Sequence, residues 1–418
     1  MIILRLLAGL ALLAGSTAVQ AITTHFTASF APSLSNPENN SFTNTTPVSG
    51  YCLNFPEECE ETGTFSIDIG LKATLITEGI YANASPRDSM YFGMPGAWRD
   101  LVVTNSTTGS TATLRFRVSA FAARFYFPDG KGSGTWKGGS FVYAPPPCLY
   151  SGVLWGGNRS TQFMWKLPGS ASDVACYKIA TVDYLGAPTS IESFSIGYEL
   201  NTPNPLQMQS GEYSGTLNLS VGQGADFDFG NNFAMNDSNV YLNFTLSVNH
   251  ELNITTTPED QKVTLQPCAG GKICTEAEGE ANWERWMITR ITPQLTGRSH
   301  FNLSSSGAFT VYLACEQQSG SDCALRSDNA PSQLIPVQTL LTLPENVVDN
   351  ATGTRISKRR LAAGKELEKN VFVTKTFGQN KRGSIDFLID QREVDTMLKT
   401  RPDTFRGAVT VIFDPKIY

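Results

Sequence analysis

The sequence predicts an all-β protein made of two β-sandwich domains. Short segments in which apolar and polar residues alternate, the period of a half-buried strand, recur along nearly the whole chain. They are bounded by Gly, Pro, Asn and Asp, whereas helix-period patterns are scarce. The 418 residues exceed the size of about 250 to 300 residues at which one hydrophobic core stops growing, so two domains are expected.

The first 21 residues have the pattern of a secretory signal peptide. Arg5 supplies the basic start, an apolar run follows from Leu6 to Ala14, and the small residues Val19 and Ala21 precede the cleavage point. The apolar run is too short to span a bilayer. We therefore exclude residues 1–21 from the fold and expect an exported protein.

Residues 22–267 are predicted to form the first domain. The expected strands include "THFTASFAP", "GTFSIDIGL", "ATLRFRVSAFAARFYF", "SIESFSIGYEL", "YSGTLNLSV" and "VYLNFTLSVNHELNI". In the last of these, His250 falls on the apolar face. A histidine of the core or of a sheet edge is the simplest interpretation there, ahead of a ligand role.

Residues 268–286 are predicted to be the linker, because "CAGGKICTEAEGE" is rich in glycine and acids and has no periodic pattern. The two tryptophans of "NWERWMITR", which follow, are helical neighbours or part of a strand that turns a corner, and we expect them to pack at the domain junction. Residues 287–418 then form the second domain. It includes a short helix in "QREVDTMLKT", predicted from the spacing of Val394, Met397 and Leu398 and ended by Pro402.

All eight cysteines follow the signal segment, which is typical of an oxidising compartment. Eight cysteines allow 105 connectivities, and short spacing favours pairs of neighbours. The expected pairs are Cys52 with Cys59, Cys148 with Cys176, Cys268 with Cys274, and Cys315 with Cys323. A metal site is not expected, because there is no C-x-x-C pair and the chain has three histidines. No cofactor is expected either.

The charge is unevenly distributed. The net charge is −6, and 24 of the 38 acids but 14 of the 32 bases precede residue 284. The larger domain is therefore acidic, which argues against nucleic acid as its partner.

The last strand of the second domain matches a strand of the first domain. Both segments have an aromatic residue, then a glycine, then alternate apolar residues. The matching positions are Tyr213, Gly215, Leu217, Leu219 and Val221 in the first domain and Phe405, Gly407, Val409, Val411 and Phe413 in the second. In the first domain further strands follow, and in the second none does. We expect the second sandwich to lack its final strand and to be completed by a strand from a partner chain.

This arrangement resembles the two-domain minor subunits placed as adhesins at the tip of chaperone–usher fimbriae. The residues that carry the resemblance are the glycine-led strand from Phe405 to Phe413, the stretch "GEYSGTLNLSVGQGADFDFG", and the domain order behind a signal peptide. One feature departs from the commonest pilin pattern, because Tyr418 is last where an aromatic residue usually stands second from the end.

The resemblance implies a fold, a set of partners and a site. The second domain would be an incomplete immunoglobulin-like pilin domain, with Val409, Val411 and Phe413 bordering the groove for a donated strand. A periplasmic pilus chaperone would fill this groove first, and the adjacent pilin subunit would replace it during assembly at the outer-membrane usher. The protein would then lie at the bacterial surface, at the fimbrial tip. "ITTHFTASF" is expected to be a strand of the first domain, although donation of this strand to another subunit stays an alternative.

The first domain of such a subunit would recognise a receptor, either a host glycan or a protein. Sugar recognition uses aromatic faces and planar polar groups presented on loops. Two stretches, residues 91–100 and 124–158, combine such side chains with many glycines. The candidate receptor-binding residues are Tyr126, Trp136, Tyr143, Trp155 and Trp98, with Tyr91, Arg99, Asp129, Lys131, Lys137, Tyr150 and Asn158 beside them. The alternative for each aromatic residue is a place in the core or at a sheet edge.

Three other functions are considered. A tip subunit could initiate assembly without binding a receptor. Asp226 and Asp228 could form the carboxylate pair of a glycosidase, although an amphipathic edge with a solvated acidic face is simpler, and we expect no catalysis. Many Asn-x-Ser/Thr sequons, including Asn44 and Asn105, would suit a eukaryotic glycoprotein, but Asn and Thr in exposed strands also produce them by chance.

Overall fold

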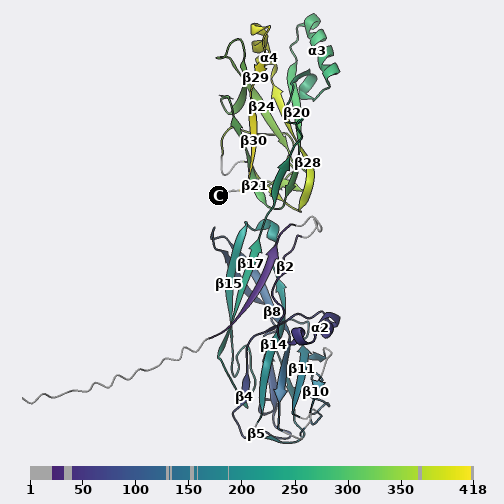
Figure 1. The fold of residues 1–418 in the computed structure, drawn as a ribbon, viewed down its shortest axis with the longest axis vertical. Helices are drawn as coiled ribbons and strands as arrows, with labels where there is room; N and C mark the ends of the chain where they lie inside the picture. The colour runs from purple at the N-terminus through teal and green to yellow at the C-terminus, as the bar shows by residue number, and fades with distance from the viewer. Residues whose placement is uncertain are drawn as a thin grey trace, which may run out of the picture.

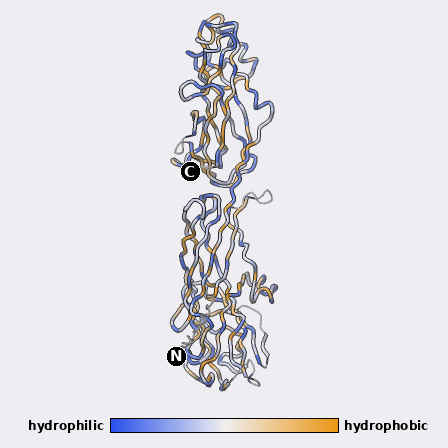
Figure 2. Tube along the Cα trace, turned by 60° about the vertical axis from the view of Figure 1, so that its left-hand side comes forward, coloured by the Kyte–Doolittle hydropathy of each residue, from blue (hydrophilic) through white to orange (hydrophobic). Residues whose placement is uncertain are grey.

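A computed structural model describes residues 21–32, 40–128, 131, 134–150, 155–157, 159–186, 188–365 and 370–415, with the side chains of Tyr150 and Trp155 excepted. The predicted signal peptide, apart from Ala21, lies outside the described residues, as do Asp129, Asn158 and Tyr418. The chain forms two curled β bodies placed end to end (Figure 1). Hydrophobic and hydrophilic residues alternate along many of the strands of both bodies (Figure 2). The predicted all-β, two-domain class is confirmed.

The first body contains one large sheet of 13 described strands and two small two-stranded sheets. The main path of the large sheet is β16-β4-β14-β8-β7-β15-β17-β1-β2. Its strands are β1 (Ile22–Phe30), β2 (Thr43–Asn44), β3 (Ser66–Asp68), β4 (Ala73–Leu75), β7 (Arg99–Asn105), β8 (Thr111–Tyr126), β9 (Leu149–Tyr150), β10 (Trp155–Gly156), β11 (Ser160–Lys166), β14 (Ser190–Asn201), β15 (Gly211–Ser220), β16 (Phe233–Met235) and β17 (Asn239–Val248). The small sheets pair β6 (Met90–Met94) with β12 (Val174–Lys178) and β5 (Gly79–Ile80) with β13 (Tyr184–Leu185).

The first described strand belongs to the first body, as the sequence predicted. β1 runs parallel to β17 in an unbroken register from Ile22 opposite Val240 to Phe30 opposite Val248. The apolar residues of β17 are buried at every second position because one face of the sheet covers the core. β17 in turn pairs with β15 along its whole length. The edge of β15 is therefore paired by a strand of its own domain.

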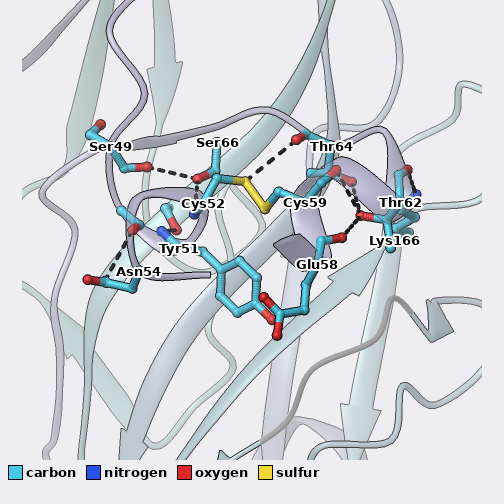
Figure 3. The surroundings of a disulfide bond; sticks show 12 residues. Ser49, Tyr51, Cys52, Asn54, Glu58, Cys59, Thr62, Thr64, Ser66 and Lys166 are labelled. Carbon is cyan, nitrogen blue, oxygen red and sulfur yellow. Dashed lines mark hydrogen bonds between the residues drawn. A yellow bond between two sulfur atoms is a disulfide. The ribbon is translucent and has the colours of Figure 1, made fainter. Parts of the chain in front are cut away.

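A helical hairpin of α1 (Tyr51–Asn54) and α2 (Pro56–Thr62) packs on the face of this sheet. The Cys52–Cys59 disulfide joins the two short helices, and Figure 3 shows its surroundings. Ser66 Oγ accepts a hydrogen bond from the Cys52 backbone N–H at 2.8 Å and donates one to the Ser49 carbonyl at 2.8 Å. Helices this short are marginal alone, so the disulfide and these contacts hold the hairpin.

All four disulfides join the neighbouring cysteines that the spacing predicted: Cys52–Cys59, Cys148–Cys176, Cys268–Cys274 and Cys315–Cys323. Among the described residues, no group of three His, Cys, Asp or Glu side chains lies close enough to hold a metal ion. In the same part of the chain no helix is long and apolar enough to cross a membrane.

The second body is a sandwich of two sheets. The larger sheet has the path β18-β20-β28-β24-β23-β22, and the smaller one has the order β25-β27-β21-β30. The strands are β18 (Leu252–Thr255), β19 (Gln266–Cys268), β20 (Gln294–Ser305), β21 (Ala308–Cys315), β22 (Gln318–Ser319), β23 (Asp322–Ser327), β24 (Leu334–Thr342), β25 (Val347–Asp349), β26 (Arg359–Arg360), β27 (Val371–Thr374), β28 (Gly378–Ile389), β29 (Phe405–Arg406) and β30 (Val409–Asp414). Its helices are α3 (Glu276–Thr289) and α4 (Gln391–Met397), the second of which was predicted.

The structure moves the predicted domain boundary. β18 and β19 both pair with β20, so the second body begins near residue 252 and not after residue 267. The predicted linker, residues 268–286, contains a disulfide and most of α3. Its glycines are bounded by the capping box of Thr275 and Glu278, which begins the helix. The linker prediction was therefore wrong.

The two tryptophans of α3 do not pack at the domain junction. Trp283 and Trp286 are helical neighbours with ring centroids 5.4 Å apart. α3 contacts β19 at the end of the second body that is remote from the first body (Figure 1). The junction prediction failed because the change of sheet occurs before α3, directly after β17.

His250 lies at the junction between the bodies. Its Nε2 is 2.7 Å from the Met208 carbonyl oxygen of the first body, and its Nδ1 is 3.2 Å from Ser306 Oγ of the second. Its ring also meets the ring of Phe30 edge-on, with centroids 5.7 Å apart. Burial lowers the pKa of His250, and the hydrogen bond to Met208 opposes only part of this effect. β17 ends at Val248, so His250 is a junction residue and not part of that strand's apolar face.

The stability of the junction is expected to fall in mild acid. Because the folded pKa of His250 is below the ordinary value of about 6.5, the neutral ring stabilises the folded state above that pH. This contribution is lost as the pH falls from about 6.5 toward the lowered pKa, at up to about 1.4 kcal/mol per pH unit. Unfolding temperatures between about pH 7 and pH 5 should therefore decline more steeply for the natural chain than for His250→Gln. Equal slopes in the two proteins would contradict this role of His250.

Candidate functional site

One edge of β30 is open. β30 pairs with β21 in antiparallel register, with Phe413 opposite Val311, Val411 opposite Leu313 and Val409 opposite Cys315. It is the last strand of its sheet, and in the described part of the chain no strand pairs with its other edge. An edge strand of this kind presents unpaired backbone N–H and C=O groups to any further strand.

A groove runs beside this open edge. One section of about 540 Å³ is lined by Val409, Val411 and Phe413 of β30, with Phe301 of β20 and Phe387 of β28 on its floor. A second section of about 640 Å³ continues along the chain from Val409 back to Asp403. Residues 261–265, between β18 and β19, form the opposite wall. The groove is thus long, mainly apolar on its floor and bordered by a free strand edge.

The side chains of β30 that face this groove are only partly buried. Val409, Val411 and Phe413 pack against the core of the second body but remain accessible. The ring centroid of Phe413 lies 5.3 Å from that of Phe301 and 6.0 Å from that of Phe309. Covering such surface is favourable by about 25 cal/mol per Å² of apolar area removed from water. The groove therefore favours an occupant with apolar side chains.

The matching strand of the first body explains what the groove lacks. Gly215 in β15 and Gly407 before β30 both allow close approach of a neighbouring backbone. A Cβ at Gly215 would lie 2.5 Å from the Val102 carbonyl oxygen, and one at Gly407 would lie 2.8 Å from that of Ala324. The two strands differ at their edges. β15 pairs with β17, whereas no described strand pairs with the corresponding edge of β30.

A second candidate surface lies at the far end of the first body. β5 and β13 form a small ladder there, with Ile80 opposite Tyr184 and Gly79 opposite Leu185 (Figure 1). Ile76, Tyr81 and Leu185 are exposed on and beside this ladder, Ile76 to 64%. We call these three residues the distal apolar surface. Exposed apolar side chains that cluster in this way mark interaction surfaces.

Polar groups fix the geometry of the distal apolar surface. The Tyr81 hydroxyl donates a 3.0 Å hydrogen bond to Glu78, and this bond raises the pKa of Tyr81. The Ala82 backbone N–H donates to Asp183 at 2.8 Å. Both hydrogen bonds fix the turn after β5, so Tyr81 projects from an ordered loop.

The four predicted receptor residues whose side chains are described, Trp98, Tyr126, Trp136 and Tyr143, do not form one site. Trp136 is buried, with 2% of its surface exposed, and its ring stacks on Tyr184 at 4.9 Å. It supports the β5–β13 ladder from inside, so its assignment to a receptor face is corrected to the core. Tyr143, in the same loop, is 51% exposed. The side chain of Trp155 lies outside the described residues.

Tyr126 and Trp98 lie near opposite ends of β8. Tyr126 is half-buried under the guanidinium of Arg124 at 5.0 Å. Trp98 lies between the guanidinium groups of Arg115 and Arg117, at 5.3 and 5.4 Å. Ten residues of strand between these ends correspond to roughly 33 Å, too far for one sugar to touch both.

Asp226 and Asp228 do not form a solvated acidic face. Asp228 is buried and accepts two hydrogen bonds from Arg87, at 2.9 and 3.1 Å. Asp226 accepts from Arg99 and from Ser220. Burial would raise the pKa of Asp226, but these hydrogen bonds outweigh burial and lower it. Both carboxylates hold the turn after β15, so the expectation of a solvated face was wrong.

Comparison with known proteins adds solved structures of low similarity. The adhesive subunit CfaE of CFA/I fimbria of enterotoxigenic Escherichia coli is 9% identical with a TM-score of 0.23, covering 94% of this chain and 92% of its own. A second match is the CsuC–CsuE chaperone–tip adhesion subunit complex of archaic chaperone–usher Csu pili of Acinetobacter baumannii. It is 10% identical with a TM-score of 0.20, and the match covers 94% of this chain and 99% of the other. A chaperone–tip adhesin complex of CFA/I fimbriae is 8% identical with a TM-score of 0.25, and the match covers 95% of this chain and 97% of the other.

These structural neighbours are tip adhesins or complexes that contain one. The superpositions are poor, so they transfer no site and no ligand to this chain. No model of a known protein family matches the sequence, and no curated protein matches it either.

Sequence reasoning missed the distal apolar surface. The stretch "LITEGIYAN" has two apolar residues that flank a Glu-Gly turn, which reads as an ordinary short strand pair. The signal that could have revealed the surface is the two adjacent apolar pairs, Leu75 with Ile76 and Ile80 with Tyr81, because neighbouring residues of an extended chain point to opposite faces. Their exposure depends on where β13, about a hundred residues later, meets β5.

Proposed function

We propose that this protein is the tip adhesin of a chaperone–usher pilus. The observation that supports this proposal most directly is the open edge of β30 beside its apolar groove. A strand laid along this edge would make ladder hydrogen bonds with β30 and place alternate apolar side chains on Phe301 and Phe387. It would complete the second sandwich in the way that β17 completes the first.

The proposal implies a sequence of partners. After export, a periplasmic chaperone fills the groove first, which protects an otherwise aggregation-prone edge. The adjacent pilin subunit then replaces the chaperone strand at the outer-membrane usher. The protein ends at the tip of the fibre on the cell surface, joined through its second body.

Within this proposal the first body is a binding domain and not an enzyme. Arg87 and Arg99 engage the paired carboxylates Asp228 and Asp226, which leaves neither free as a general acid or base. The distal apolar surface is the receptor-contacting surface, because it lies at the end of the molecule opposite the attachment groove (Figure 1). Ile76, Tyr81 and Leu185 favour an apolar or aromatic partner surface over a strongly charged one.

Co-expression tests the attachment role. The chain should be recovered as a one-to-one complex with the fimbrial chaperone of the organism that encodes it, and should aggregate or be degraded without that chaperone. Recovery of a stable monomer with the groove empty would refute the proposal.

Substitution tests the adhesive role. The triple variant Ile76→Ser, Tyr81→Ser, Leu185→Ser should lower binding of the chaperone-bound protein to target cells or apolar beads at least about tenfold, because these side chains supply the contact area. The matched control is Val102→Ser, because Val102 on β7 is an exposed apolar residue outside the distal apolar surface. This variant should bind as the natural chain does. Unchanged binding by the triple variant would favour a tip subunit that only initiates assembly.

A further inference from the structure

The end of the second body remote from the first carries an exposed apolar helix face. Ile288 of α3 is 85% exposed, and Met287 and Ile291 beside it are also exposed. Trp286 adjoins them and is half-exposed. We call these four residues the α3 patch. A contiguous exposed patch of large apolar side chains is uncommon on a monomer and marks an interaction surface.

The helix that carries the α3 patch is firmly held. Thr275 and Glu278 form a capping box at its beginning, and the Asn282 amide donates a 2.8 Å hydrogen bond to the Pro267 carbonyl. Gly279 is buried against Gln266, whose Oε1 would lie 2.7 Å from a Cβ at that position. Trp283, on the inner face, packs on the core near Leu295. The outer face is therefore presented by a fixed element and not by a fraying end.

Charged side chains of both signs lie beside the α3 patch, with exposed Glu284 one helical turn before Ile288. The guanidinium groups of Arg290 and Arg401 each lie 5.6 Å from the Trp286 ring, and Arg285 is exposed on the same helix. An apolar centre with a charged rim is the usual composition of a protein interface.

α3 lies at the end of the second body where the 640 Å³ section of the groove is found, and its inner face shares an apolar cluster with that section. The groove section of 640 Å³ includes Leu265 and Leu295, which belong to the same apolar cluster as Trp283. The opposite end of β30 faces the first body, where Pro415, Met208 and His250 line one cavity of about 400 Å³. A strand donated to the groove would therefore meet the first body at one end. The folded domain that donates the strand would lie at the other end, beside α3.

From these observations we infer that the α3 patch docks the folded body of the same subunit that donates its strand to the groove. This inference rests on the proposed attachment role. The partner surface is apolar at its centre, and it meets the α3 patch while the partner's extension lies along β30. The second body then holds its neighbour at two places, which fixes the orientation of the tip on the fibre.

The test compares two probes on the same variants. The first probe is the complete pilin subunit that co-purifies with the chain from fibres, and the second is a synthetic peptide of that subunit's N-terminal extension. The double variant Ile288→Asp, Ile291→Asp should bind the complete subunit at least about tenfold more weakly but the peptide with unchanged affinity. Val102→Asp, exposed on the first body, is the matched control and should behave as the natural chain with both probes.

The outcomes separate this inference from the attachment role. If the natural chain binds neither probe, the groove has no donated strand and the attachment role itself fails. If the double variant binds the subunit as tightly as the natural chain does, the α3 patch is not the docking surface. If it loses capture by the chaperone instead, the patch serves the chaperone and the inference is overturned.

Discussion

Replacing Phe413 with aspartate is expected to abolish the complex with any strand that fills the groove of β30. The Phe413 ring contacts Phe301 and Phe309 and is only partly covered. A donated strand would bury this position fully, and a buried unpaired carboxylate costs several kcal/mol, about a thousandfold or more in affinity. Capture of the variant on an affinity-tagged chaperone, followed by size-exclusion chromatography, measures the loss.

The control for this prediction lies on the same strand. Thr410 is exposed and alternates with Val409 and Val411, so Thr410→Asp adds the same charge to the opposite face of β30. It should retain chaperone binding to within a few fold. Val411→Asp repeats the test at a second groove position. Limited proteolysis of the first body, whose core does not include β30, shows whether the rest of the chain is folded. Equal capture of the Phe413 and Thr410 variants would mean that no strand occupies the groove.

The open edge could be anticipated because its cause is local. Alternation from Phe405 to Phe413 places Val409, Val411 and Phe413 on one face whatever the rest of the chain does. The internal match to Tyr213 and its strand then indicates which neighbour should exist. Gly407 and Gly215 share a packing reason, the close approach of a carbonyl oxygen, which is why the two stretches look alike.

The domain boundary and α3 could not be anticipated because their causes are not local. β17 and β18 are separated by three residues yet belong to different sheets, and no change of composition marks the transfer. In α3 the apolar residues fall on both faces, with Trp283 inside and Ile288 outside. A helix with this distribution lacks the single apolar stripe that a periodicity argument requires.

The candidate receptor residues show the same division between local and distant causes. A tryptophan among glycines suggests an exposed loop, but Trp136 is drawn inside by contacts with Tyr184, which is 48 residues later, and with Phe125 of β8. Conversely, Leu185 looks like a strand residue and is exposed, on a ladder that pairs only Ile80 with Tyr184 and Gly79 with Leu185. The sequence indicated that residues 91–100 and 124–158 of the first body are rich in aromatic residues, but not which side chains face outward.

Trp136→Ala is therefore expected to destabilise the first body by about 3 to 5 kcal/mol, the range for deleting a buried large aromatic side chain. The Trp136 ring stacks on Tyr184 at 4.9 Å and meets Phe141 edge-on at 5.0 Å, and its removal leaves a cavity beneath the β5–β13 ladder. Urea unfolding of the chaperone-bound protein, followed by tryptophan fluorescence and circular dichroism, measures the change in the free energy of unfolding.

Tyr143→Ala, in the same loop but 51% exposed, should change the free energy of unfolding by no more than about 0.5 kcal/mol. Receptor binding by Trp136→Ala should fall only in proportion to the loss of folded protein, because the ring touches no ligand. A Trp136→Ala variant that is as stable as the natural chain but has lost receptor binding would return this residue to the receptor face. The distal apolar surface would then have to be redrawn around the loop from Trp136 to Tyr143, since Tyr143 is the exposed aromatic side chain that this loop already presents.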